Sequence, residues 1–108
     1  METIVLFDSI AEGIKIIGNR EIKKIRVDRR EYGITRYEEE FYVFDVYCPH
    51  MEYDLTTGKV SPAATVICPW HNYQFRLQTG IELEDRCKRL VIKKAFSNTE
   101  GNLCFDPW

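Results

Sequence analysis

The most informative parts of this sequence are CPHMEYDLTTG, residues 48–58, and CPWHNYQFRLQTG, residues 68–80, which we name the first arm and the second arm. The chain has only two histidines, His50 and His71, and each lies close to a cysteine at the start of an arm. Thiolate sulfur and imidazole nitrogen are common ligands of transition metals. The pattern therefore predicts a metal site formed by Cys48, His50, Cys68 and His71.

The way the ligands are shared between the arms indicates which metal they bind. A zinc finger usually takes a cysteine pair from one stretch and a histidine pair from another. Here both arms are mixed, C-x-H and C-x-x-H, which suits a binuclear centre with both cysteines on one metal and both histidines on the other. A mononuclear zinc site remains an alternative, because two cysteines and two histidines are also a zinc set. A disulfide framework fits the placement of the histidines less well.

The arms resemble those of the Rieske iron–sulfur family, whose pattern is C-x-H, a gap of similar length, and then C-x-x-H. The likeness extends from about Ile22 onward and is greatest to the ferredoxin branch. It implies one [2Fe–2S] cluster, with two cysteines on one iron and two histidines on the other. It also implies an antiparallel β-sandwich with a small cluster-binding subdomain of two ligand loops at approximately residues 46–82. We expect residues 1–108 to form this single domain.

Short apolar segments separated by turn residues independently predict an all-β chain. The expected strands are Thr3–Phe7, Ile22–Val27, Glu31–Arg36, Phe41–Tyr47, Thr65–Ile67, Tyr73–Leu77, Leu90–Phe96 and Leu103–Phe105. The strand at Phe41–Tyr47 is apolar on both faces, so we expect it to be central in its sheet and to deliver Cys48 at its end. A single helical turn is expected at Ser9–Gly13, with Asp8 as its cap.

Two features of the chain depart from the family pattern. Relatives usually have glycine where this chain has Glu52 and Asn72, at positions that can require a positive φ angle, which asparagine tolerates better than glutamate. The third loop that covers the cluster in relatives is proline-rich, whereas the corresponding Leu83–Arg89 contains no proline. Cys87 and Cys104 lie outside the motif and are expected to be small apolar side chains.

The resemblance also bears on the reduction potential. Rieske centres span roughly −150 to +300 mV, against about −400 mV for plant-type ferredoxins. High-potential relatives have a disulfide between the loops and hydroxyl donors to sulfur, whereas the corresponding positions here look like Tyr53, Trp70, Tyr73 and Phe75. We therefore expect a potential near the low end of the range, which suits an electron donor to an oxygenase.

Composition limits the classes of partner. The chain has 108 residues, 44% hydrophobic and 30% charged, with a formal net charge of −2 and no basic stripe, so a nucleic-acid partner is not expected. The start, METIVLFDSIAEG, has neither the basic region of a secretory signal nor a membrane-spanning run. We expect a cytoplasmic monomer without membrane association.

These expectations combine into one functional hypothesis. The chain is expected to be a Rieske-type ferredoxin that passes single electrons from a flavin- or NADH-dependent reductase to an oxygenase, with His50 and His71 at an exposed tip. It is not expected to be an enzyme by itself, because the mononuclear iron of such oxygenases needs further histidines. One alternative is the small Rieske subunit of a nitrite reductase or another multicomponent reductase. Another is a binding module with a zinc or degenerate site.

Overall fold

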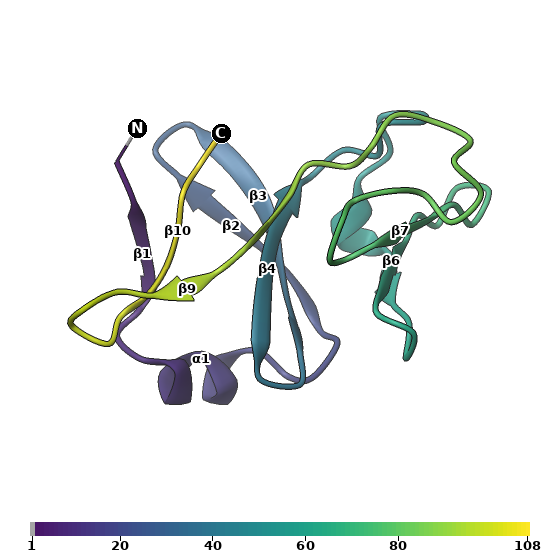
Figure 1. Cartoon of the computed structure of the whole chain (residues 1–108). Helices are drawn as coiled ribbons and strands as arrows, with labels where there is room; N and C mark the ends of the chain where they lie inside the picture. Colours follow the sequence, from purple (N-terminus) through teal and green to yellow (C-terminus); the bar gives the residue numbers. More distant parts are fainter. Residues whose placement is uncertain (1) are drawn as a thin grey trace.

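The computed structural model describes residues 2–108, whose strands form three sheets (Figure 1). The first sheet has the order β1 (Ile4–Phe7), β10 (Leu103–Phe105) and β9 (Phe96–Ser97). The second has the order β2 (Ile22–Val27), β3 (Arg30–Tyr37), β4 (Glu40–Asp45) and β8 (Ile92–Lys94). The third contains β5 (Lys59–Val60), β6 (Thr65–Ile67) and β7 (Gln74–Arg76). All strand pairs in these sheets are antiparallel, as the sequence predicts.

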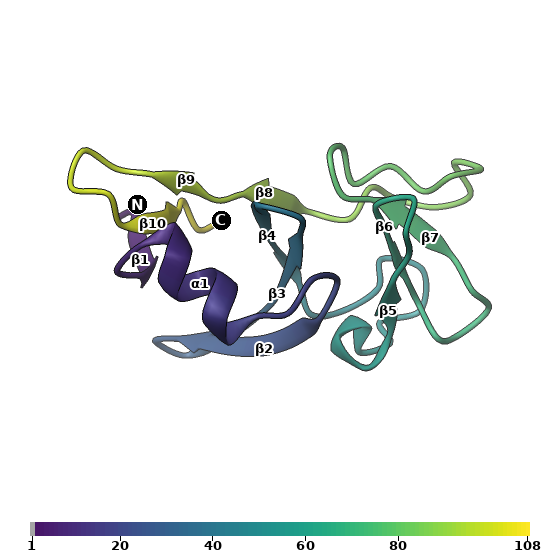
Figure 2. The same ribbon diagram turned by 90° about the horizontal axis from the view of Figure 1, so that it is seen from below.

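The sheets are arranged as a sandwich with the third sheet at one end. The first two sheets face one another, and helix α1 (Ile10–Ile16) lies along the edge between them (Figures 1 and 2). The β5–β6–β7 sheet and the short 3-10 helix η1 (Leu55–Thr57) lie beyond the end of β4, and both chain termini lie on the sandwich, away from that sheet (Figure 1). This arrangement separates the two arms from the termini.

Strand β4 contributes to both hydrophobic cores of the molecule. It pairs with β3 on one side and β8 on the other, which confirms its predicted central position. Phe41 and Val43 lie in the core of the sandwich, whereas Tyr42 and Phe44 lie in the core beneath the arms. Because successive side chains of a strand point to opposite faces, one apolar strand can serve both cores. The same strand therefore fixes the arms to the sandwich.

The close packing of β3 on β4 requires a glycine. Gly33 is paired with Phe44, and a Cβ atom added at Gly33 would lie 2.4 Å from a carbon of the Phe44 ring. Any side chain at this position would displace the ring from its fully buried place. Gly33 thus lets Phe44 pack across the ladder into the core beneath the arms.

Several predicted elements differ from the structure in extent. The helical turn expected at Ser9–Gly13 is the helix α1, and its cap is Ser9 rather than Asp8, because the Ser9 hydroxyl accepts the N–H of Glu12 at 3.1 Å. The strand expected at Leu90–Phe96 is divided between β8 and β9, which belong to different sheets. Strand β5 was not predicted, because two residues are too few to show alternation. In residues 2–108, no helix is both long and apolar enough to cross a membrane.

Candidate metal centre

The two arms have the same backbone closure. The N–H of Cys48 donates to the carbonyl of Tyr53, and the N–H of Cys68 donates to the carbonyl of Tyr73, both at 2.8 Å. Each hydrogen bond joins a cysteine to the residue five positions later, so the histidine lies inside the loop that it closes. One residue of each arm, Leu55 and Phe75, is completely buried in the core beneath the loops. The arms are thus two similar loops fixed to one apolar core.

Left-handed backbone conformations shape the tips of both arms. Glu52 has a φ of 54° in the first arm, and His71 and Asn72 have φ angles of 68° and 56° in the second. The positive φ expected at the two glycine positions of the family is therefore present at Glu52 and Asn72. Such a conformation costs a residue other than glycine about 1 kcal/mol or more, and least for asparagine.

The cysteine side chains of the arms lie together on the inner side. Cys48 and Cys68 are fully buried in the core beneath the arms. The pKa of the Cys68 thiol is raised to about 11, mainly by burial and in smaller part by the neighbouring Cys48 thiol, while a hydrogen bond from the backbone N–H of Trp70 opposes the shift. Two adjacent buried thiols suit a metal that displaces their protons, because the thiolate is the form that binds.

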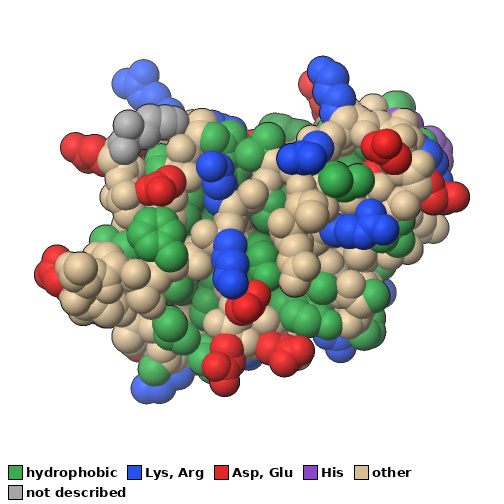
Figure 3. Space-filling view, viewed as in Figure 1, with side chains coloured by type: hydrophobic (Ala, Val, Ile, Leu, Met, Phe, Trp, Pro, Cys, Tyr) green, Lys and Arg blue, Asp and Glu red, His purple; other side chains and the backbone are tan. Residues whose placement is uncertain are grey.

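The histidine side chains lie together on the outer side. The ring centroids of His50 and His71 are 5.7 Å apart. His50 is half-buried and stacks on the ring of Tyr73, at 4.0 Å between centroids and 11° between planes. His71 is exposed and lies 5.1 Å from the ring of Trp70. Imidazole surface is visible in purple at the end of the molecule that carries the third sheet (Figure 3).

The four residues fit a binuclear cluster with two protein ligands on each metal. The structure brings the two thiols together and the two imidazoles together. Nδ1 of His50 is buried and has no hydrogen-bond partner among residues 2–108, a condition that a metal bond would relieve. In the same residues, no three His, Cys, Asp or Glu side chains are grouped to hold one metal ion. Pairs of donors, two sulfur and two nitrogen, are the set that a Rieske [2Fe–2S] cluster requires.

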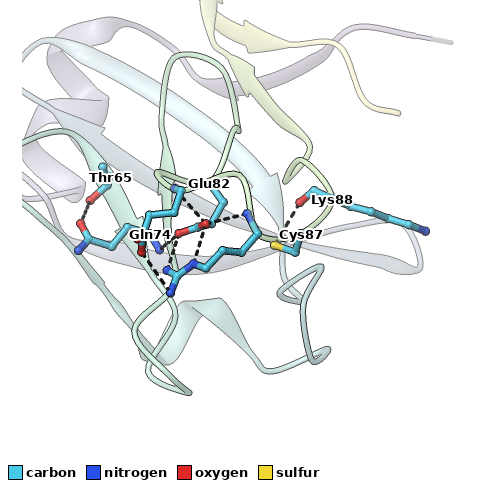
Figure 4. Close-up of polar contacts among 7 residues, drawn as sticks. Thr65, Gln74, Glu82, Cys87 and Lys88 are labelled. Carbon is cyan, nitrogen blue, oxygen red and sulfur yellow. Dashed lines mark hydrogen bonds and ion pairs between the residues drawn. The ribbon is translucent and has the colours of Figure 1, made fainter.

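Sequence reasoning missed two residues that contact this site. Glu82 is buried directly before Leu83–Arg89, which corresponds to the covering loop of relatives and which we name the covering segment. Its carboxylate accepts hydrogen bonds from neighbouring backbone and side-chain groups (Figure 4). Arg86 forms an ion pair with Glu82 at 2.6 Å, and its guanidinium carbon lies 3.9 Å from the ring centroid of Tyr73. The only sequence signal for this ion pair is the spacing of an acidic and a basic residue four positions apart. No pattern in the sequence connects that pair to Tyr73.

The four cysteines of the chain are all free thiols. Cys104 is fully buried in β10, as expected for a small apolar side chain. Cys87 is half-buried and packs against the core beneath the arms. Burial raises its pKa, and so does the thiol of Cys48.

The sandwich and the paired sulfur and nitrogen side chains together fit an iron–sulfur protein. Residues 11–93 match the family model described as the Rieske [2Fe-2S] domain. The chain belongs to the Rieske [2Fe-2S] domain family, whose cofactor is one [2Fe–2S] cluster.

Two curated relatives match part of the sequence. The ferredoxin component of an alkene monooxygenase system from Xanthobacter autotrophicus is 28% identical over 60 residues, which cover 56% of this chain and 49% of that protein. Cholesterol 7-desaturase from Xenopus laevis is 36% identical over 53 residues, which cover 49% of this chain and 11% of that protein. The matched region thus spans half or less of each relative.

Solved structures share the fold over almost the whole chain. The ferredoxin of carbazole 1,9a-dioxygenase from Nocardioides aromaticivorans has a TM-score of 0.79 and 17% identity, with 100% of both chains covered. A structure from Mycobacterium tuberculosis assigned as an NADH-dependent nitrite reductase small subunit has a TM-score of 0.75 and 14% identity, with 96% of this chain and 93% of that chain covered. These similarities confirm the predicted β-sandwich.

Proposed function

We propose that this chain is a one-electron carrier whose [2Fe–2S] cluster is held by Cys48 and Cys68 on one iron and by His50 and His71 on the other. When bound, the cluster accepts and releases a single electron. The observation that carries the proposal is the separation of the four side chains into a buried sulfur pair and an outer nitrogen pair. Approximately residues 46–82 serve as the cluster-binding subdomain of a single domain, residues 1–108.

The chain's own residues give the two sides of the site different tasks. The buried thiolates of Cys48 and Cys68 hold the inner side of the centre away from water. On the outer side, His71 is exposed, whereas one ring face of His50 is covered by Tyr73. His71 is therefore the exit for electrons. The sequence predicts both histidines at an exposed tip, and the geometry favours His71.

The partners that we propose follow from the relatives. The carrier receives electrons from a flavin- or NADH-dependent reductase and delivers them to an oxygenase. The alkene monooxygenase component named above is itself a ferredoxin, and another structure of the same fold is named as a complex of reduced oxygenase and oxidized ferredoxin. The chain does not catalyse oxygenation alone, because both of its histidines are assigned to the cluster. We place the protein in the cytoplasm.

A second candidate is the small subunit of a nitrite reductase. The structure from Mycobacterium tuberculosis supports it, because its TM-score differs little from that of the carbazole dioxygenase ferredoxin. The two candidates differ in how long the partner stays bound. A subunit should co-purify with a large redox protein in fixed stoichiometry, whereas a carrier should elute as a monomer.

The proposal is tested with anaerobically purified protein. We expect about two irons and about two acid-labile sulfides per chain. After reduction by an NADH-dependent ferredoxin reductase, mixing with an oxidised Rieske-type oxygenase should reoxidise the chain with one electron transferred per molecule. Protein that binds iron and sulfide but reduces only a nitrite reductase large subunit would favour the second candidate. Protein that binds zinc alone would contradict both.

A further inference from the structure

The carboxylate of Glu82 is buried close to the arms and belongs to none of the proposed ligand pairs. It accepts the backbone N–H groups of Glu84 and Arg86, both at 3.1 Å, and two guanidinium nitrogens of Arg86, at 2.9 and 2.6 Å. These bonds, the guanidinium bonds first, lower the pKa of Glu82 to about 2. Glu82 is therefore ionised near neutral pH, and its two-point contact fixes the plane of the guanidinium.

The fixed guanidinium reaches His50 through Tyr73. Arg86 lies 3.9 Å from the Tyr73 ring centroid, and the His50 ring lies 4.0 Å from the same centroid. Two groups this close cannot share one face of a ring, so Arg86 and His50 lie on opposite faces of Tyr73. The covering segment, the second arm and the first arm thus contribute one planar group each to a single stack.

The ion pair itself needs an explanation beyond stability. The Glu82 carboxylate is buried and loses its hydration, whereas the Arg86 side chain is 37% exposed, so much of the attraction between them only offsets the cost of burying the carboxylate. The member of this pair that contacts the aromatic stack is the cation. An electron taken up at the centre adds negative charge, and a nearby positive charge stabilises that state. Because the positive member of the pair is the one nearer the centre, the ion pair favours reduction of the centre.

Building on the proposed cluster, we infer that Arg86 is a positioning residue that raises the reduction potential of the centre. Glu82 holds the guanidinium, the guanidinium keeps the Tyr73 ring on His50, and the positive charge favours the reduced form. In this way the proline-free covering segment takes a direct part in setting the potential. The stack also covers one face of His50, so the same residues leave His71 as the open side.

The test is a reductive titration of the holoprotein and its variants. Arg86→Gln should lower the midpoint potential, and it should do so by more than Lys88→Gln. Lys88 is a matched control, because it removes one positive charge from the same segment, and its side chain points away from Glu82 (Figure 4). The Lys88 side chain also forms no hydrogen bond or ion pair within residues 2–108. Equal shifts in the two variants would overturn the inference.

A second variant gives the opposite sign. Glu82→Gln removes the negative charge and leaves the cation less compensated, so the midpoint potential should rise. A purely structural role would move both variants in one direction, and that result would also overturn the inference. Arg86→Lys should restore part of the potential, because it restores the charge without the planar contact.

The electron paramagnetic resonance spectrum of each reduced variant separates this inference from the proposed function. If the mixed-ligand spectrum is kept and the potential of Arg86→Gln does not move, the inference fails and the carrier function stands. If the unsubstituted protein shows no such spectrum, the proposed function itself fails.

Discussion

Each arm has one cysteine, one histidine and the same closing hydrogen bond, yet the two arms place their histidines in different surroundings. In the first arm, His50 is half-buried, and its ring is covered by Tyr73. In the second arm, His71 is exposed beside Trp70, whose ring is stacked on Tyr53 with 6.0 Å between centroids. Similar loops can therefore place equivalent candidate ligands in different surroundings, one covered by an aromatic ring and one exposed.

The origin of the difference lies outside the two ligand motifs. Tyr73 belongs to the second arm but covers the histidine of the first, and Arg86 packs on Tyr73 from the covering segment. No covering segment of this kind contacts the ring of His71 among the described residues. The asymmetry comes from packing between distant parts of the chain, and not from the local C-x-H and C-x-x-H motifs.

The largest expected effect is loss of the metal centre, and we expect it when the histidine of either arm is substituted. His50→Ala and His71→Ala should each lower bound iron from about two per chain toward zero, because one iron loses half of its protein ligands. Iron and sulfide analysis measures the effect. Cys104→Ala, which removes a buried thiol far from the arms in sequence, should retain the cluster and serves as the control. Full iron content in either histidine variant would show that the arms are not equivalent in assembly.

A smaller effect tests the ion pair that supports the covered side of His50. The pKa of Glu82 is about 2, below its ordinary 4.5, so ionised Glu82 stabilises the fold above pH 4.5, and the stabilisation is lost as pH falls toward 2. Glu82→Gln should therefore lower the free energy of unfolding by roughly 1–3 kcal/mol near pH 7. The deficit should shrink as the pH falls below 4.5.

Urea unfolding at several pH values from 2.5 to 7 measures this deficit, and Glu84→Gln is the matched control. Glu84 contacts the same arginine at 3.3 Å, but its side chain is 71% exposed, so little change is expected. A deficit for Glu82→Gln that stays constant over the whole pH range would contradict the assignment of an ionised, paired carboxylate.

Binding of the oxygenase at the exposed side of the site should depend on Trp70, the aromatic residue beside His71. Trp70→Ala removes a large side chain that is 47% exposed beside His71, whereas Met51→Ala removes one that is 53% exposed beside His50. If electrons leave through His71, Trp70→Ala should weaken binding to the oxygenase about tenfold, with Met51→Ala having the smaller effect. Both variants should keep the midpoint potential. Equal losses of affinity would mean that the partner contacts both histidines alike.

The smallest effect compares the tips of the arms. Glu52→Gly should stabilise the protein by about 1 kcal/mol, because glycine adopts a positive φ without strain. Asn72→Gly should change stability by only a few tenths of that, roughly 0.3 kcal/mol, because asparagine already tolerates this conformation. Thermal unfolding of the two variants side by side measures the difference. A larger gain at Asn72 would contradict this ranking.

The sequence predicts the parts of this molecule that depend on local pattern. The bounds of Ile22–Val27, Thr65–Ile67 and Leu103–Phe105 are confirmed, because apolar alternation and turn residues mark them. The four candidate ligands were found because their residue types are rare in this chain and closely spaced. Strand β4 was recognised as central because both of its faces are apolar.

Features that depend on tertiary packing were not predictable from those patterns. The strand expected at Leu90–Phe96 divides because its two ends pair with different sheets, which local alternation does not encode. The stack of Arg86, Tyr73 and His50 joins three segments that only folding brings together. Its absence from the sequence prediction left the two histidines looking equivalent. The difference between them became visible only in the structure.

The central claim is that the two arms hold one binuclear cluster with both imidazoles on the same iron. Pulsed electron paramagnetic resonance of the anaerobically reduced protein tests it most directly, because it detects nitrogen nuclei bound to the paramagnetic centre. We expect couplings from two directly bound histidine nitrogens, with the signal changed by His50→Ala and by His71→Ala. A reduced cluster with no directly bound nitrogen would contradict the account.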